Sequence, residues 1–394
     1  MPEPTRRTWA ENSPAASSTG TTLWEIASVF LKLGATAFGG PAAHIAMLQH
    51  EVVERRGWIS QAEFLDHLGA SSIIPGPTST ELVIHIGRRR AGWPGLLVAG
   101  ACFILPAAVM VGVLAWAYVR YGQLLAVSGL LYGVKPVVIA LVVQALWKLG
   151  RSAIKDLWLA AVGMFALAIS ALGVRPLPVL LAGGVLALAG SRSQSRGKVA
   201  LWRILPQPAA LAAGATAAAA GLWPVFWIFV KIGAMVFGSG YVLLVFLRAD
   251  LVERHRWLTQ QQLLDAVAVG QVTPGPVFTT ATFLGYLLHG APGAVAATVG
   301  IFLPAFFLVA VTAPLLPKIR ASRSAGAALD GVNVASLALM ALVTWQLARS
   351  ALVDWSTLAL AAGSVALLLR FPRLNSAWLV AIAGLTGALL YTIG

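Results

Sequence analysis

The stretch VERRGWISQAEFLD, residues 53–66, returns as VERHRWLTQQQLLD at residues 252–265, 199 residues later. Similar segments flank both copies: FLKLGATAFGG (30–40) corresponds to FVKIGAMVFGS (229–239), and IIPGPTST (73–80) corresponds to VTPGPVFT (272–279). Self-similarity at a fixed spacing is the sign of a duplicated unit. We therefore expect a disordered tail at 1–22, a first repeat at 23–190, a basic loop with a linker helix at 191–221, and a second repeat at 222–394.

The composition of the 394-residue chain indicates a membrane protein. Hydrophobic residues make up 58% of it and charged residues only 11%, whereas soluble domains carry about 25% charged residues. Apolar runs such as 96–118, 124–147 and 291–316 approach or exceed the roughly 20 residues that cross a bilayer as a helix. The sequence predicts an all-α polytopic membrane protein with about six spans in each repeat and about thirteen in total, counting the linker helix.

The distribution of basic residues predicts that the second repeat is inserted upside down. Cytoplasmic loops carry an excess of Lys and Arg. With the N-terminus inside, we expect these basic residues of the first repeat in the cytoplasm: Arg88, Arg89, Arg90, Lys148, Arg151 and Lys155. Only Arg55, Arg56, Arg120 and Arg175 are expected outside. The bias is kept in the second repeat only if that repeat is inverted, and inverted repeats are typical of secondary transporters.

Each repeat contains a helix start followed by a helix break. Ser60 with Glu63, and Thr259 with Gln262, have the spacing of a capping box, which predicts a helix start. Each helix then meets a Pro-Gly-Pro stretch, which proline cannot continue. The residues of the two breaks are Pro75, Gly76, Pro77 and Thr78, and Pro274, Gly275 and Pro276. Pro77 and Pro276 suit the first position of a new helix.

Such a break presents unpaired N–H groups and the positive end of a helix dipole at membrane depth, which is a ready anion site. The alternative is a kink whose freed groups are satisfied by neighbouring helices. Because two symmetric copies each follow a capped helix, we favour a binding element.

A lysine lies deep in the span that precedes each break. Lys32 and Lys231 are about eight residues into apolar segments, where a charge costs about 2.5–3.5 kcal/mol on insertion scales and usually marks function. Two lysines balance a dianion; the alternative is that each snorkels to the interface. The glycines and serine that follow, Gly39, Gly40, Gly238 and Ser239, permit close approach of the backbone. We expect both lysines and both breaks to face one central cavity.

Other ionisable residues are not shared by the repeats. Glu81 and His85 lie four residues apart on one helix face, so they are candidates for proton coupling, although a buried pair without a transport role fits equally well. Thr280 and an apolar residue replace them in the second repeat. Lys135, opposite Asn333, is either a second anion contact or, as we slightly prefer, a snorkelling lysine.

The duplicated hexapeptide itself contains Glu54, Arg55, Trp58, Glu253, Arg254 and Trp257. Tryptophan suits a membrane interface, and the acid–base pairs are able to lock or gate a loop. The simpler interpretation, which we prefer, is an interfacial turn that positions the next helix.

These segments together resemble the chromate ion transporter family, in its long form with both domains in one chain. The resemblance rests on FGGPAAHI (38–45), the following ERRGW, IPGPTSTELVIHIG (74–87) and their weaker echoes in the second half, and it covers nearly the whole chain. It implies a prokaryotic inner-membrane protein that exports chromate at the expense of the proton motive force. The exchange of Gly40-Pro41 for Ser239-Gly240 and of His44 for a leucine argues against one site built equally by both halves.

The residues alone do not separate chromate from sulfate, since both are tetrahedral dianions, nor do they give the direction of transport. No G-x-x-x-x-G-K-[ST] loop is present, which excludes this route to ATP as the energy source. Scattered acids disfavour an enzyme acting on lipid phosphates, because such a site groups its catalytic residues. The expected partners are an oxyanion such as chromate or sulfate, protons and the lipid bilayer. Nucleic acid and cofactors are not expected.

Overall fold

The computed structural model describes residues 19–38, 40–71, 74–122, 125–193, 221–237, 242–312, 323–371 and 376–393. Within these ranges all regular elements are helices, and no strand occurs. Four helices among them are long and apolar enough to cross a membrane: Thr78–Tyr121, Gly129–Ala153, Val277–Thr312 and Gly326–Ala351. Their outer faces expose large apolar side chains, as lipid contact requires. The chain is an all-α multi-pass membrane protein, as its composition predicts.

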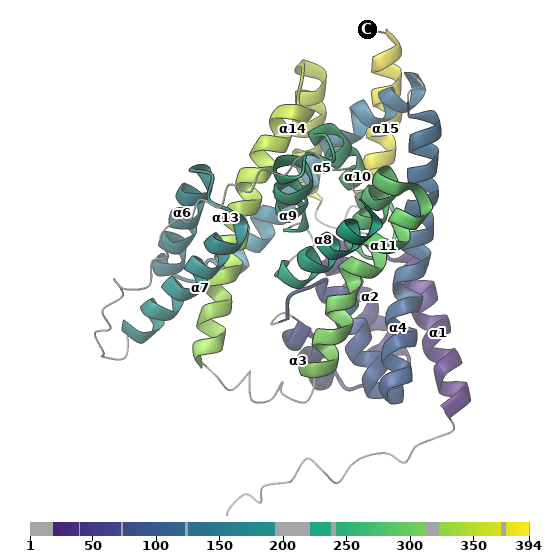
Figure 1. Cartoon of the computed structure of the whole chain (residues 1–394), viewed down its shortest axis with the longest axis vertical. Helices are drawn as coiled ribbons and strands as arrows, with labels where there is room; N and C mark the ends of the chain where they lie inside the picture. The colour runs from purple at the N-terminus through teal and green to yellow at the C-terminus, as the bar shows by residue number, and fades with distance from the viewer. Residues whose placement is uncertain are drawn as a thin grey trace, which may run out of the picture.

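The helices of the first repeat follow the order expected from its motifs. They are α1 (Thr19–Thr36), α2 (Gly40–Gln49), the π-helical η1 (His50–Arg55), α3 (Gln61–Ser71), α4 (Thr78–Tyr121), α5 (Leu125–Ala153), α6 (Leu157–Ala171) and α7 (Pro176–Ser193). Figure 1 shows α1 to α4 gathered in one part of the molecule and α6 with α7 in another.

The second repeat has the same succession of elements. They are α8 (Leu222–Met235), α9 (Leu243–Leu247), the π-helical η3 (Arg248–Arg254), α10 (Gln260–Val272), the 3₁₀ turn η4 (Val277–Thr279), α11 (Thr280–Thr312), α13 (Arg323–Ala351), α14 (Trp355–Arg370) and α15 (Ser376–Ile393). Most of the expected linker, residues 194–220, and most of the N-terminal tail, residues 1–18, lie outside the described residues. The count of thirteen spans therefore stays a prediction.

Both predicted capping boxes are present. The Ser60 N–H donates to a Glu63 carboxylate oxygen at 3.0 Å, and the Glu63 N–H donates to the Ser60 hydroxyl at 3.2 Å. Thr259 and Gln262 make the same two bonds at the start of α10. The exchange satisfies N–H groups that the first helical turn leaves unpaired.

Both Pro-Gly-Pro stretches break the chain, but the prolines do not stand in the first helical position as expected. Pro77 and Pro276 have extended ψ angles of 96° and 130°. An extended residue cannot belong to the first helical turn, so Pro77 is the N-cap and α4 begins at Thr78. In the second repeat, η4 separates Pro276 from α11.

The two longest helices, α4 and α11, are each folded at a glycine. Gly92 and Gly290 both have a φ of 60°, a conformation that glycine adopts at little cost. In α4 the segments before and after Gly92 then pack tightly against each other, since a Cβ on Gly87 would overlap the carbonyl of Gly95. Each helix is therefore a hairpin with a short first arm, 78–90 in α4, and a long second arm, 93–121 in α4.

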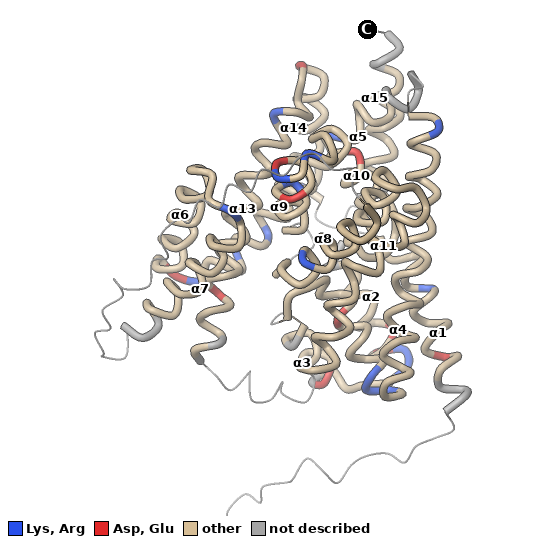
Figure 2. Tube along the Cα trace, in the orientation of Figure 1, with Lys and Arg blue, Asp and Glu red and all other residues tan. Residues whose placement is uncertain are grey.

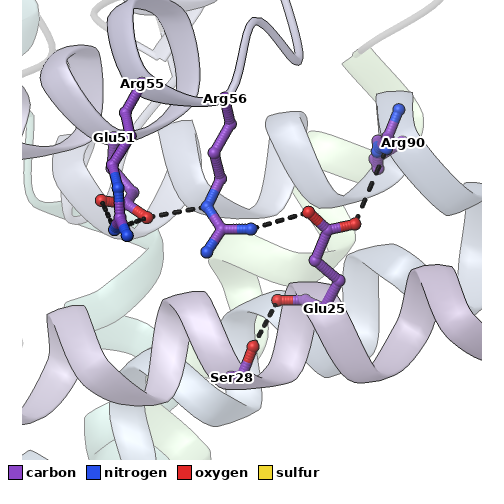
Figure 3. Close-up of polar contacts among 6 residues, drawn as sticks. All are labelled: Glu25, Ser28, Glu51, Arg55, Arg56 and Arg90. Carbon is purple, nitrogen blue, oxygen red and sulfur yellow. Dashed lines mark hydrogen bonds and ion pairs between the residues drawn. The ribbon is translucent and has the colours of Figure 1, made fainter.

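Charged residues show that the first repeat enters the protein interior twice and returns to the same end. Glu25, near the start of α1, forms ion pairs with Arg56 just after η1 (2.7 Å) and with Arg90 at the end of the first arm of α4 (3.8 Å) (Figure 3). From the charge distribution we expected Arg56 on the opposite membrane face from Arg90. That placement is wrong, because the breaks after α1 and at Gly76 turn the chain back before it has crossed.

The polar segments of the two repeats lie at opposite ends of the molecule. Arg90 precedes the second arm of α4, which is about 40 Å long at 1.5 Å per residue. At its far end, the hydroxyl of Tyr118 donates to Asp265 of α10 at 2.8 Å. Figure 2 shows one group of charges beside α1, α3 and the start of α4, and another beside α9 and α10.

The repeats are interlocked through their last two helices. Helices α6 and α7 pack against α13 of the second repeat, and α14 and α15 pack against α5 of the first repeat. Helices α4 and α11 also pack against each other. The two repeats therefore exchange equivalent contacts.

Candidate functional site

Two reciprocal hydrogen bonds join the helix breaks at the centre of the molecule. The Gly76 N–H donates to the carbonyl of Val236 at 2.7 Å, and the Gly275 N–H donates to the carbonyl of Ala37 at 2.9 Å. Ala37 and Val236 directly follow α1 and α8, the helices that carry Lys32 and Lys231. We call Ala37, Gly76, Val236 and Gly275 the central junction. Each Pro-Gly-Pro break therefore meets the helix end of the other repeat.

The junction requires glycine at both breaks. Gly76 and Gly275 have φ angles of 143° and 91°, which L side chains rarely adopt. A Cβ on Gly275 would lie 2.6 Å from the Cβ of Ala107 and 2.9 Å from the carbonyl oxygen of Gly34. A Cβ on Gly76 would overlap a carboxylate oxygen of Glu81. The Glu81 carboxyl therefore lies directly against the first break.

The first arm of α4 places a group of buried polar side chains beside this junction. Ser79, Thr80, Glu81 and His85 are almost completely buried, and we call them the polar arm. Among the described residues, both Glu81 oxygens, the Thr80 hydroxyl and Nε2 of His85 have no hydrogen-bond partner. Buried polar groups without partners are costly. In a membrane protein such groups mark sites for a proton or a polar ligand.

Two further histidines adjoin the polar arm, and the sequence analysis assigned neither to the site. His44 is buried, with Nε2 3.0 Å from the Ala37 carbonyl and Nδ1 3.4 Å from the Ser79 hydroxyl. Since a carbonyl only accepts, Nε2 carries the proton, and a neutral ring accepts from Ser79. The ring of His67 in α3 stacks on that of His85 at 5.5 Å. The sequence did contain a signal for His44: its counterpart in the second repeat is Leu243, so this histidine is specific to the first repeat.

The second break lacks this polarity. The Thr279 and Thr280 hydroxyls donate at 2.8 Å to the carbonyls of Pro276 and Val277, within their own turn. Phe278 is buried close by. Gln271, before the break, is buried, and its amide nitrogen has no partner among the described residues. At this break the described counterparts of Glu81 and His85 are Thr280 and Leu284, neither of which is ionisable.

The two lysines are in different surroundings. Lys32 lies on the exposed side of α1. The Lys231 ammonium donates to both carboxylate oxygens of Asp250 at 2.7 Å. The expected pair of free cations is therefore not what the structure gives, because Asp250 already neutralises Lys231. Glu51 occupies the equivalent position in the first repeat, and it binds Arg55 at 3.0 Å and Arg56 at 2.7 Å.

The duplicated hexapeptide is not simply a connecting turn. Glu54 and Arg55 end η1, and Glu253 and Arg254 end η3. Their contacts are Glu54 with His50 (2.8 Å), Glu253 with Arg248 (2.6 Å) and Arg254 with Asp250 (3.9 Å).

Aromatic contacts complete each charged segment. The guanidinium groups of Arg56 and Arg90 each lie 5.4 Å from the centre of the Trp58 ring, and the rings of Trp257 and His255 are 4.7 Å apart. The acids at the centre of the clusters, Glu51 and Asp250, were missed by the sequence analysis. Their shared spacing of 199 residues was the signal that identifies them.

The remaining predicted site residues are only partly described. Pro75, Thr78, Pro274 and Pro276 belong to the breaks, and Gly40 begins α2. The residues Gly39, Gly238 and Ser239 lie outside the described residues.

Comparisons with known proteins identify relatives over almost the whole chain. The sequence profile described as Chromate transporter matches residues 24–188 and again 223–388. A chromate transport protein of Cupriavidus metallidurans is 34% identical over 94% of this chain and 94% of its own length. One of Pseudomonas aeruginosa is 33% identical over 92% of this chain and 91% of its own. These relatives are named as transport proteins and not as enzymes. No solved structure shows a significant match.

Proposed function

The chain belongs to the chromate transporter family, and from this premise we propose that it is a secondary transporter that exports chromate across the plasma membrane, driven by the proton motive force. The observation that carries the proposal is the buried Glu81 carboxyl against Gly76 at the central junction, where no described residue gives it a hydrogen bond. Export protects a cell from a toxic oxyanion, so the physiological outcome is chromate resistance.

The anion is recognised at the central junction by charge and shape. A dianion entering a dry interior faces a desolvation cost of tens of kcal/mol in the idealised limit. The N-termini of α4 and α11 and the hydroxyls of Thr78 and Ser79 replace part of its hydration shell. Lys32 is exposed and Lys231 is paired with Asp250, so their ammonium groups balance the charge of the anion only once the repeats move and Lys231 leaves Asp250. The reciprocal bonds that tie both breaks to both lysine-bearing helices support this arrangement.

Proton coupling uses Glu81 and His85. Their burial beside the first break, in the absence of such a pair at the second, supports a single proton site per chain. A carboxyl that is neutral when protonated and charged when deprotonated changes the net charge beside the anion by one unit. Anion binding and proton binding at one junction are thereby linked.

Alternating access follows from inverted repeats. The position of the two charged segments at opposite ends of α4 supports an inverted insertion, with Arg88, Arg89 and Arg90 in the cytoplasm. The clusters around Glu54, Arg55 and Trp58, and around Glu253, Arg254 and Trp257, then act as gates at the two faces.

Cysteine labelling tests the inversion. In a Cys102→Ala background, single cysteines at position 57 and at position 256 should react with an impermeant maleimide from opposite sides of the membrane. Reaction of both from the same side would end the inverted arrangement and the gating that depends on it.

Flux in vesicles tests the function. Purified protein in liposomes, with an imposed pH gradient, should accumulate radiolabelled chromate, and dissipating the gradient should stop accumulation. Radiolabelled sulfate is measured in parallel, because the junction does not distinguish two tetrahedral dianions by charge. Transport of sulfate alone, by uptake or exchange, would replace chromate as the substrate. Absence of transport of both anions would refute the proposal.

A further inference from the structure

A buried ion pair joins the two repeats away from the central junction. The Lys135 ammonium in α5 lies 2.8 Å from one carboxylate oxygen of Asp265 in α10, and the side chains are only 12% and 3% exposed. The other oxygen accepts a hydrogen bond from the Tyr118 hydroxyl of α4 at 2.8 Å. The lysine and tyrosine belong to the first repeat and the aspartate to the second. The expectation that Lys135 snorkels is therefore wrong, because Asp265 holds it inside.

Neither a gain in stability nor the duplication of the repeats explains why the Lys135–Asp265 ion pair is present. Removing two charges from water costs so much that apolar residues of similar size often stabilise a protein more than a buried ion pair does. The duplication does not impose it either, since Asn333 stands in place of Lys135 and the exposed Asp66 in place of Asp265. An ionisable pair retained inside a membrane protein points to function.

The pair also lies on the approach to the second break. Asp265 lies seven residues before Val272, the last residue of α10, which is about 10 Å along a helix, and Pro274 follows two residues later. Helix α5 runs beside α10 toward that break, because Val137 and Leu141 pack in one cluster with Val272 at the end of α10. Lys135 therefore lies on one of the two helices, α5 and α10, that run together toward the second break at Gly275.

We propose that Lys135 binds the transported oxyanion and that Asp265 takes the place of that anion in the state described here. The inference rests on the proposed function, because the ligand is its substrate. A carboxylate and a tetrahedral oxyanion both offer the ammonium group negatively charged acceptor oxygens. Alternating access moves one repeat against the other, and this ion pair spans both. Movement that separates α5 from α10 therefore transfers Lys135 from Asp265 to the anion.

The test removes both charges at once. In Lys135→Met/Asp265→Asn no unpaired buried charge remains, so the protein should fold. We expect chromate flux in liposomes to fall at least tenfold. Flux at the wild-type rate would show that the pair is structural and overturn the inference. Lack of chromate and sulfate transport by the wild type would instead refute the proposed function.

A second ion pair provides the matched control. Lys155, in the connection between α5 and α6, and Asp330 of α13 also join the two repeats, at 2.7 Å, but their side chains are 57% and 31% exposed. Lys155→Met/Asp330→Asn should transport at close to the wild-type rate. An equal loss in this control would contradict a special role for Lys135.

Two measurements separate a ligand from a structural lock. In Lys135→Asp/Asp265→Lys the pair is restored with the cation on α10, and we expect no recovery of transport; full recovery would favour a lock. Thermal unfolding of detergent-solubilised protein covers the case in which that variant does not fold. Chromate or sulfate should raise the unfolding temperature of the wild type and of the Lys155/Asp330 control, but not that of Lys135→Met/Asp265→Asn. An equal rise in all three would overturn the inference.

Discussion

The first and second breaks have the same backbone and different chemistry. At both, a central glycine with positive φ donates its N–H to the residue that follows the first helix of the other repeat. At the first break, Glu81 and His85 are buried with unpartnered atoms. At the second, the Thr279 and Thr280 hydroxyls bind carbonyls of their own turn. The duplicated features therefore build the scaffold, and the features that differ supply the ionisable groups.

The largest difference in transport between the two breaks is expected from substitution of Glu81. Glu81→Gln should abolish pH-driven chromate accumulation and leave anion binding largely intact, because the amide keeps the shape of the carboxyl but cannot exchange a proton. The measurement is flux in liposomes at several imposed pH gradients. Thr280→Ala is the control at the equivalent position, and it should transport normally because its hydroxyl serves only its own turn. Unchanged pH dependence in Glu81→Gln would remove this residue from the coupling mechanism.

The lysines should show the next largest effect. Lys32→Met and Lys231→Met should each lower chromate flux at least tenfold, and Lys→Arg should not restore it, because the guanidinium group is larger and its donors are forked. The exposed Lys148 near the end of α5 gives the control Lys148→Met.

Lys231 needs a second variant, since its loss leaves Asp250 with the more distant Arg254. Lys231→Met/Asp250→Asn should unfold at the wild-type temperature and still fail to transport. Recovery of flux in that double variant would reduce Lys231 to a partner of Asp250.

Alanine substitutions of the two junction glycines should affect different properties, one mainly the proton coupling and the other mainly the stability of the fold. In Gly76→Ala the new methyl group meets the end of a flexible side chain, Glu81, whereas in Gly275→Ala it meets the backbone of Gly34 and the Cβ of Ala107. Gly275→Ala should therefore lower stability more, by about 1–3 kcal/mol as in other overpacked interiors. Gly76→Ala should change the pH dependence of transport more. Equal thermal unfolding and equal pH profiles for the two variants would contradict this difference.

The smallest effects are expected at the helix caps, where the repeats are most alike. Ser60→Ala and Thr259→Ala should each cost about 1 kcal/mol, measured by thermal unfolding, with little change in transport. The Ser60 N–H bond holds the pKa of Glu63 below its usual value. Its stabilisation is therefore present above the unfolded pKa and is lost as pH falls through the lower folded pKa. Gln262 does not titrate, so acid should weaken the cap of α3 and leave that of α10 unchanged.

The features that depend on local order along the chain follow from the amino-acid sequence. Composition predicted helices in a membrane, the 199-residue spacing predicted two repeats, and Ser60, Thr259, Pro75 and Pro274 predicted where helices begin and break. Each of these follows from the preferences of a few consecutive residues, such as the missing N–H of proline. The closeness of Glu81 to the first break was predictable for the same reason, since Glu81 follows Pro77 by four positions.

Which distant groups meet depends on how the helices pack in three dimensions. Arg56 and Arg90 were expected on opposite faces because the segment between them was expected to cross the membrane despite its Pro-Gly-Pro break, whereas the folded chain returns them both to Glu25. The pairing of Lys231 with Asp250 and of Lys135 with Asp265 depends on how separate helices pack. Ion pairs act through space over a few ångströms, and no local pattern in the chain specifies which charges are brought that close.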